Sequence, residues 1–175
     1  MTEKLQTLRD SAFARWSALL LIAMMMFFAY MFVDFLSPLK NALETSLNWD
    51  STTFGTYAAS EYFLNVFCLF LIFAGIILDK MGIRFTGLLS ASLMVIGACI
   101  KFYAMSEYFV GTGLESWLGS WWVALPASAK LSCLGFMIFG CGCEMAGTTV
   151  SKAIAKWFKG KEMAMAMGLE MSIAR

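Results

Sequence analysis

The chain has 175 residues, of which 60% are hydrophobic and only 14% are charged, and its formal net charge is +1. A soluble globular protein is about half apolar and about a quarter charged, so this composition excludes an ordinary soluble domain and indicates a membrane protein. The small net charge gives no indication of a nucleic-acid partner. The chain has five cysteines and no histidine. All five lie in apolar runs, and the C-x-C pair Cys141 and Cys143 has no histidine to complete a common zinc set, so they are interpreted as small packing residues and no cofactor is expected.

Four apolar runs are long enough to cross a bilayer as helices, which takes about 20 residues each. They cover residues 16–36, 54–78, 85–105 and 131–150. Each run contains one charged residue, and in chain order these are Asp34, Glu61, Lys101 and Glu144. The first run is too long for a signal peptide and no small-residue cleavage site follows it, so we expect it to remain as the first span.

A fifth apolar run begins at Met163 and is 13 residues long where the sequence stops at Arg175. As a helix it covers about 20 Å, which is too short for a hydrocarbon core of about 30 Å. The sequence therefore predicts an all-α membrane protein, with four complete transmembrane helices and the start of a fifth over residues 16–175. It also predicts that the chain is a fragment of a longer protein.

Two connections are expected on the outer side of the membrane. Pro38 and the polar stretch that follows it mark the first, and a longer external loop covers about residues 106–129. This loop holds three tryptophans close together, Trp117, Trp121 and Trp122. Such a group is typical of anchoring at the membrane interface.

Lysine and arginine near the span ends predict the orientation of the chain. One side carries nine of them, namely Lys4, Arg9, Arg15, Lys80, Arg84, Lys152, Lys156, Lys159 and Lys161, and the other side carries Lys40 and Lys130. Because positive residues stay on the cytoplasmic side, residues 1–15 are predicted to form a cytoplasmic N-terminus. The predicted location is the cell (inner) membrane, crossed several times.

The short inner loop between the second and third spans reads GIILDKMGIR, residues 75–84. Gly82 permits a tight turn between two helices, and Asp79 lies at a helix end, where charges pair and meet helix dipoles. Any short inner loop is basic and contains glycine, but that does not explain Asp79 four residues after Gly75. Five positions resemble the signature of the major facilitator superfamily, usually written G-x-x-x-D-[RK]-x-G-x-[RK]. They are Gly75, Asp79, Lys80, Gly82 and Arg84.

This resemblance implies a transporter of twelve helices, of which the chain is the N-terminal part, built from inverted three-helix repeats. It also implies that the loop is a conformational switch, a charge relay that latches one conformation and is released in another. Ile83 stands where many members carry a second basic residue. The family's partner for the aspartate lies in the C-terminal half, so that half is an expected partner of this chain, together with the solute and the lipid bilayer.

Glu144 lies in the fourth span, and an ionisable residue at membrane depth indicates a functional site. Gly140 and Gly147 lie on the same helix face, at i−4 and i+3. Such a shallow face lets either a ligand or another helix approach the backbone, so helix packing stays open as the alternative. A protonated or paired Glu144 in a structural role is a further alternative.

Three further stretches resemble one branch of the superfamily, that of the lysosomal dipeptide uniporter and its bacterial relatives. They are WFKGKE with the Ala- and Met-rich run that ends in Ser-x-x-Arg (157–175), FGCGCE (139–144) and, more loosely, YMFVDFLSPL (30–39). In that branch the glutamate of span four and the arginine of span five contact the charged ends of a dipeptide. By position, these substrate-binding roles fall on Glu144 and Arg175. An ion pair of Arg175 with Glu144 or Glu170, without a ligand, is the alternative.

Three further residues are substrate-binding candidates, Tyr30 in span one and Glu61 and Asn65 in span two. Aromatic packing is the more ordinary role for Tyr30. Asp34 is near the outer end of its span and has the ordinary reading of a loop charge. Glu61 either lines a cavity or pairs with Lys101, whose long side chain can also extend outward to the interface.

The sequence thus predicts a secondary transporter that moves a small zwitterionic solute, for example a dipeptide, by alternating access, and that is inactive as a fragment alone. Phe136 stands where many proton-coupled members carry an arginine. This favours uniport, although Glu144, Glu61 or Asp34 still offers a proton carrier. Organic anions or sugars are the alternative solutes, and a non-transporting membrane scaffold is the alternative class. An enzyme is not expected, because intramembrane proteases of the aspartyl and serine types need facing aspartates at depth or a serine–histidine pair.

Overall fold

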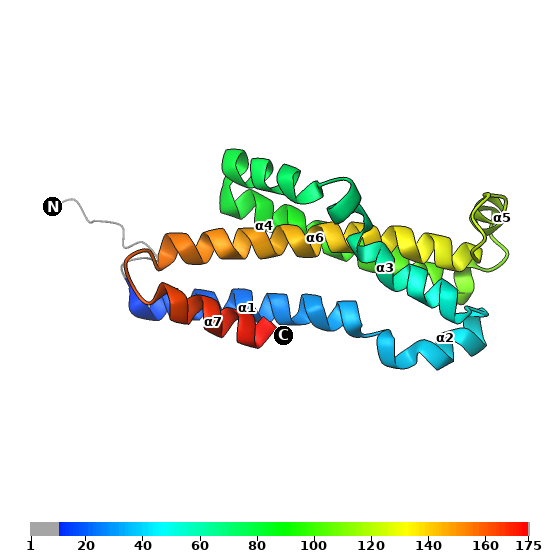
Figure 1. Cartoon of the computed structure of the whole chain (residues 1–175), viewed down its shortest axis with the longest axis horizontal. Coiled ribbons are helices and arrows are strands. Elements are labelled where there is room, and N and C mark those ends of the chain that lie inside the picture. Colours follow the sequence, from blue (N-terminus) through cyan, green and yellow to red (C-terminus); the bar gives the residue numbers. More distant parts are fainter. Residues whose placement is uncertain (1–10, 175) are drawn as a thin grey trace.

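The computed structural model describes residues 11–174, and this part of the chain folds into helices joined by short connections (Figure 1). In chain order the elements are α1 (Ala12–Asp34), η1 (Ser37–Leu39), α2 (Lys40–Leu47), α3 (Ser51–Phe67), α4 (Phe70–Ala104), η2 (Glu107–Phe109), α5 (Gly113–Gly119), α6 (Ala127–Trp157) and α7 (Met163–Ala174). No strand occurs among residues 11–174. The prediction of an all-helical protein is confirmed for this part of the chain.

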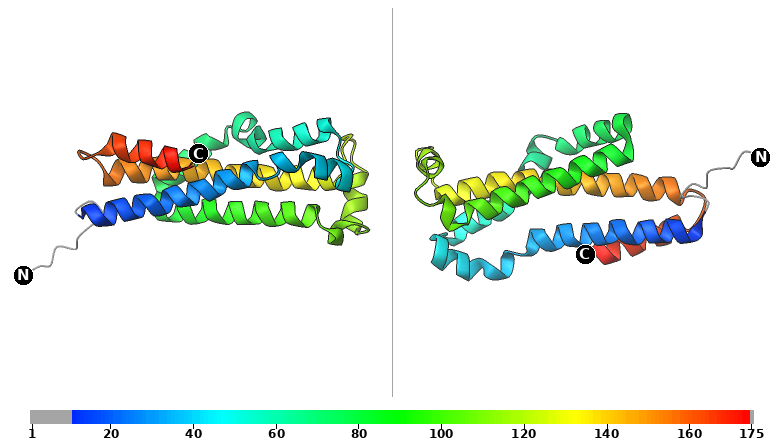
Figure 2. Two further views of the ribbon diagram at one scale, coloured as in Figure 1. Left: turned by 90° about the horizontal axis from the view of Figure 1, so that it is seen from below. Right: turned by 180° about the vertical axis from the view of Figure 1, so that it is seen from behind.

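The described chain contains three stretches that are long and apolar enough to span a membrane: Ala12–Leu47, Phe70–Ala104 and Ala127–Trp157. The long helices run side by side along the longest axis of the molecule (Figure 2). α1 packs mainly against α7, and α6 packs against both α3 and α4. More of α6 is buried than of α1 or α4, so α6 is the central helix of the bundle.

The second predicted span is interrupted in the structure. The sequence predicted one apolar helix over residues 54–78, but α3 ends at Phe67 and α4 begins at Phe70. Between them Leu69 has φ 52° and ψ 37°, the left-handed conformation that costs an L-residue roughly 1–2 kcal/mol. The chain therefore changes direction at Cys68 and Leu69, between the cyan and green helices of Figure 2.

The turn between the second and third predicted spans lies inside α4, at Gly82. The backbone of this residue has φ 79° and ψ 172°, outside the helical region, so α4 consists of two helical arms that meet there. This positive φ is readily adopted by glycine and is costly for other residues. The predicted turn at Gly82 is confirmed, and the second arm runs back along α6 (Figure 1).

Glycines bring α4 and α6 into close contact. A Cβ atom built on Gly97 would lie 2.5 Å from the carbonyl oxygen of Gly135, and one built on Gly142 would lie 2.7 Å from the carbonyl oxygen of Ser90. Neither position has room for a side chain, so the two backbones touch. Because lipid supplies no hydrophobic drive between helices, such close packing is what stabilises the pair.

Polar contacts tie each end of the bundle. At one end the guanidinium of Arg15 lies 3.7 Å from the carboxylate of Glu162, which joins the start of α1 to the connection between α6 and α7. At the other end the Trp49 indole donates a 3.0 Å hydrogen bond to the Ser128 hydroxyl, which joins the α2–α3 connection to the start of α6. The connections predicted to be inner and outer therefore gather at opposite ends (Figure 1).

The predicted external loop carries the short helices η2 and α5. The rings of Trp117 and Trp121 meet edge to face, with 4.8 Å between their centres, and Trp122 is 94% exposed. At the base of this loop the Lys130 ammonium donates hydrogen bonds to the carbonyl oxygens of Leu118 and Trp121. The three tryptophans thus sit on an ordered loop at one end of the bundle, in agreement with interfacial anchoring.

Candidate functional site

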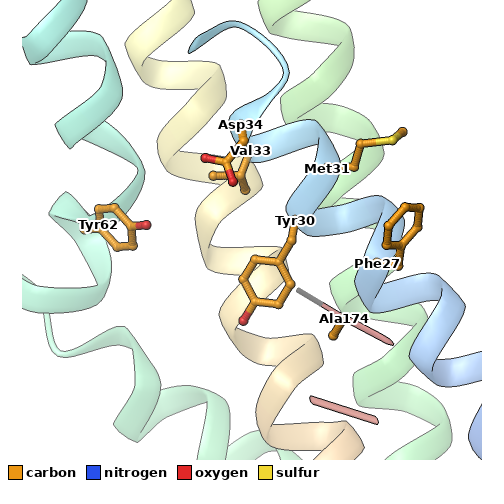
Figure 3. A pocket seen from close by; sticks show the side chains of 7 residues that line it. All are labelled: Phe27, Tyr30, Met31, Val33, Asp34, Tyr62 and Ala174. Carbon is orange, nitrogen blue, oxygen red and sulfur yellow. The ribbon is translucent and has the colours of Figure 1, made fainter. Parts of the chain in front are cut away.

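A cavity of about 500 Å³ lies between α1, α3 and α7 (Figure 3). Its lining residues are Phe27, Tyr30, Met31, Val33, Asp34, Tyr62 and Ala174. Five of them come from α1, and the spacing of residues 27, 30, 31 and 34 puts these four on one helix face. Tyr62 from α3 and Ala174, the last residue of α7, form the rest of the described lining.

Among the described residues, three polar side-chain groups line this cavity: the carboxylate of Asp34 and the phenols of Tyr30 and Tyr62. In Figure 3 the Tyr62 hydroxyl and the Asp34 carboxylate point toward one another, while the Tyr30 hydroxyl is directed toward α6. Asp34 and Tyr62 are both exposed, so a ligand can reach them. A carboxylate with two phenols suits an ammonium group, which donates hydrogen bonds and carries the opposite charge.

Glu61 and Asn65 lie one turn apart on α3 and are 3% and 7% exposed. The Asn65 amide nitrogen donates a 3.4 Å hydrogen bond to the backbone carbonyl of Glu61. A Cβ atom on Gly140 would lie 2.8 Å from the Glu61 Cγ, whereas one on Gly147 would meet the Met26 Cε at an ordinary 3.9 Å. The predicted shallow face of α6 therefore receives another helix, α3, at Gly140.

Glu61 is the centre of a group of ionisable side chains. It lies within electrostatic reach of Glu144 on α6, Lys101 on α4 and Asp34 on α1. Glu144 is half-buried and is not among the residues that line the cavity. The structure thus brings three acids and one lysine from four helices into one region, which we call the acidic cluster for its members Asp34, Glu61 and Glu144.

Arg175, the residue assigned to a solute carboxylate, lies outside the described residues. The alternative, an ion pair of Arg175 with Glu144 or Glu170, involves the same residue and also falls outside the described part of the chain. Glu170 is buried on α7, with 9% exposure. Ala174, which precedes Arg175 in the sequence, lines the cavity.

Lys101 adopts neither of the two arrangements that the sequence suggested. In the described part of the chain three ion pairs form, and Lys101 takes part in none of them. Its side chain does not extend to the interface either, because the residue is only 3% exposed. Its ammonium lies 3.9 Å from the centre of the Phe136 ring instead.

The residues predicted to form the conformational switch, Gly75, Asp79, Lys80, Gly82 and Arg84, lie at the turn of α4 and its flanks. The Lys152 ammonium on α6 lies 2.6 Å from Oδ1 of Asp79 and donates a second hydrogen bond of 3.3 Å to the carbonyl oxygen of Leu78. Lys80 and Arg84 are exposed beside the turn. Asp79 thus has a partner on α6 of the same chain. The resemblance to the superfamily had suggested a partner only in the C-terminal half.

Tyr62 and Phe27 are lining residues that the sequence reasoning did not single out. The signal for Tyr62 was the same as for Tyr30, a phenol within an apolar run. A second cavity of about 190 Å³ between α1, α4 and α6 is lined mainly by apolar side chains, and the hydroxyls on its wall are those of Ser90 and Thr149. Both donate to backbone carbonyls of their own helices, so this cavity offers little to a polar ligand.

The family model described as Major Facilitator Superfamily matches residues 19–174 of the chain. The matched range contains the cavity, the acidic cluster and the turn at Gly82. The comparisons with curated proteins and with solved structures each gave no significant match.

Proposed function

Because the chain belongs to the major facilitator superfamily, whose members are secondary transporters and not enzymes, we propose that it moves a small zwitterionic solute by alternating access, with dipeptides as the leading candidates. The observation that carries this proposal is the cavity between α1, α3 and α7, with the Asp34 carboxylate and two phenols on its wall. At about 500 Å³ it falls within the range of roughly 300–1,000 Å³ that is usual for small-molecule sites.

The charges of the region favour a solute that carries a cation. Among the described residues, Glu61 lies within electrostatic reach of two further acids, Asp34 and Glu144, and of one lysine, Lys101. Uncompensated charge inside a membrane protein costs free energy. An ammonium group from the solute would reduce this cost because it carries the opposite charge. Organic anions and sugars bring no such charge, and for this reason they are the second choice.

The two ends of the solute are assigned to different helices. Asp34 on the cavity wall and Glu144 on α6 bind the ammonium, the latter by its position in the branch that the sequence resembles. Arg175 binds the carboxylate, because its fork of donors suits two oxygens and its neighbour Ala174 lines the cavity. Tyr30 orients the solute with its hydroxyl.

Glu61 and Asn65 support the site from α3, where both are buried. The Asn65 side-chain oxygen has no hydrogen-bond partner among the described residues, so it remains free to accept a hydrogen bond from a polar solute. In this proposal Glu61 adds negative charge behind Asp34 and Glu144.

The working protein in this proposal is a twelve-helix transporter in the cell (inner) membrane, with its N-terminus in the cytoplasm. The chain is its N-terminal part, and a C-terminal half completes the cavity. The loop of Gly75, Asp79, Lys80, Gly82 and Arg84 acts as the conformational switch. Transport is facilitated uniport, because Phe136 occupies the place of an arginine found in many proton-coupled members.

The test is uptake of a labelled dipeptide by liposomes that contain the complete transporter, meaning this chain together with the proposed C-terminal half. Uptake should be saturable and should be inhibited by unlabelled free dipeptides but not by N-acetylated ones. Inhibition by sugars or organic anions instead would favour the alternative solutes. Uptake equal to that of empty liposomes for every solute class would favour a scaffold.

A further inference from the structure

Lys101 carries a charge for which the structure offers no conventional partner. The residue lies in the last turn of α4, is 3% exposed, and its ammonium nitrogen is buried without a hydrogen-bond partner among the described residues. A lysine at membrane depth normally pairs with an acid or extends to the interface. Because Lys101 does neither, another interaction must stabilise its charge.

Four aromatic rings surround the Lys101 ammonium. Its nitrogen lies 3.9 Å from the centre of the Phe136 ring, 4.4 Å from that of Phe32, 5.3 Å from that of Tyr57 and 5.8 Å from that of Phe139. A cation within about 6 Å of a ring centre is attracted by the negative face of the ring, most strongly where water is excluded. We call these four rings, which come from α1, α3 and α6, the aromatic cage.

The aromatic cage is a preformed part of the core. Tyr57 stacks on Phe136, with 4.9 Å between the ring centres and 16° between the planes. Phe32 packs on Phe139 at 4.8 Å and 32°. These contacts between the walls fix their positions, so Lys101 occupies a site that other residues hold in shape.

Glu61 lies one turn after the cage residue Tyr57 on α3, and it is within electrostatic reach of Lys101. We propose that the aromatic cage holds the Lys101 ammonium away from Glu61, so that the cage rings are positioning residues that keep the negative charge of Glu61 unpaired behind the solute cation. The inference rests on the proposed function, in which the acidic cluster binds an ammonium group. A Lys101 side chain released from the cage would pair with Glu61 and compete with the solute.

The groups that face Lys101 from the neighbouring helices agree with this role. The Tyr57 hydroxyl on α3 is buried without a hydrogen-bond partner in the described structure. The described residues supply aromatic faces to the ammonium and no hydrogen-bond acceptor. The cage therefore balances the charge of Lys101 by attraction to ring faces and leaves every carboxylate of the acidic cluster unpaired with it.

The first test needs no ligand and uses the chain itself. A hydrophobic carbodiimide joins a carboxyl group to an adjacent amine, and mass spectrometry after digestion detects a Glu61–Lys101 amide. Phe136→Leu and Phe32→Leu each remove one wall of the cage, and Phe32→Leu changes the less buried of the two. Phe102→Leu is the matched control, because Phe102 follows Lys101 in the sequence but is 76% exposed.

The Glu61–Lys101 amide should be absent from the wild-type chain and from Phe102→Leu, and present in both cage variants. An equal yield in the wild-type chain would overturn the proposal, because Lys101 would then reach Glu61 with the cage intact. Absence from both cage variants would overturn it too, because the cage would not be what separates Lys101 from Glu61.

The second test measures the affinity of the complete transporter for a free dipeptide. Phe136→Leu should weaken the affinity by about tenfold, since the released ammonium competes with the solute. The same substitution should have no effect in a Lys101→Met background, where no competitor remains. An equal loss in both backgrounds would assign Phe136 a purely structural role and contradict the proposal. Absence of dipeptide binding by the wild-type transporter would contradict the proposed function alone, because the cross-linking result decides the cage independently.

Discussion

Asp50 stabilises the start of α3 as its N-terminal cap. Its side chain accepts a 2.7 Å hydrogen bond from the backbone N–H of Thr53. Hydrogen bonds from Thr53 hold the pKa of this carboxyl below its usual value of 3.8. A group whose folded-state pKa is lowered contributes stability above the unfolded-state pKa, and this contribution is lost as the pH falls through the folded-state value.

We therefore expect Asp50→Ala to lower the Tm of the chain at pH 7, because a helix N–H loses its acceptor. The difference in Tm from the wild type should shrink as the pH falls below 3.8. Asp50→Asn is the matched control, since it keeps an acceptor but does not titrate, and it should cost less at pH 7. A Tm difference for Asp50→Ala that stays constant down to pH 2 would contradict this account of the cap.

At the scale of elements, the contact between α4 and α6 depends on glycines that leave no space for a methyl group. A Cβ atom on Gly97 would lie 2.5 Å from the Gly135 carbonyl oxygen and 2.6 Å from the Phe139 nitrogen. These are backbone atoms, which cannot rotate away. The two helices must therefore separate to admit even alanine.

We expect Gly97→Ala to lower the free energy of unfolding by roughly 1–3 kcal/mol, the usual effect of overpacking. Gly87→Ala is the control on the same arm of α4, because its Cβ would meet only the Thr149 Cγ2, at an ordinary 3.9 Å. Denaturation of both variants in the same detergent measures the difference. Equal stability of the two variants would show that the contact at Gly97 does not hold the helices together.

The helices and turns were predictable where a single segment of the sequence contains the features that determine them. Apolar runs predicted the long helices, and a glycine between basic residues predicted the turn at Gly82. The break at Leu69 had no such signal, because residues 66–70 contain neither proline nor glycine. A break of this kind depends on how α3 and α4 pack against other helices. The sequence of a single apolar run carries no information about that packing.

The candidate site was predictable only in part, for the same reason. Tyr30 was singled out as a phenol at membrane depth and lines the cavity, whereas the facing phenol of Tyr62 was not. The environment of Lys101 depends on rings from three other helices, such as Phe32 and Phe136. No spacing along one helix predicts such a cage, because its members meet only after the bundle has formed.

At the scale of the whole molecule, two ion pairs lie at the end that we assign to the cytoplasm. Asp79 at the turn of α4 pairs with Lys152 on α6, and Arg15 on α1 pairs with Glu162 after α6. Both pairs join the central helix or its end to another element. In the proposed alternating-access mechanism such contacts are kept or released in each cycle, so we expect the pair beside the proposed switch loop to affect the rate of transport.

We expect Asp79→Lys to reduce the initial rate of uptake by the complete transporter while its affinity for the solute stays unchanged. The double variant Asp79→Lys with Lys152→Asp restores the pair with reversed charges and should recover most of the rate. Uptake and binding measured on the same preparations separate the two effects. A rate that stays low in the double variant would mean that Asp79 acts through a partner other than Lys152.

In the proposed transporter, acidic residues of this chain bind the ammonium group of the solute. The most direct measurement is thermal stabilisation of the complete transporter by a free dipeptide and by its N-acetylated form, on the wild type, Asp34→Asn and Glu144→Gln. Glu107→Gln, on the external loop, is the control. We predict stabilisation by the free dipeptide only, lost in Asp34→Asn and Glu144→Gln and kept in the control. Equal stabilisation by both forms, unchanged in the two variants, would contradict the assignment and return these acids to a structural role.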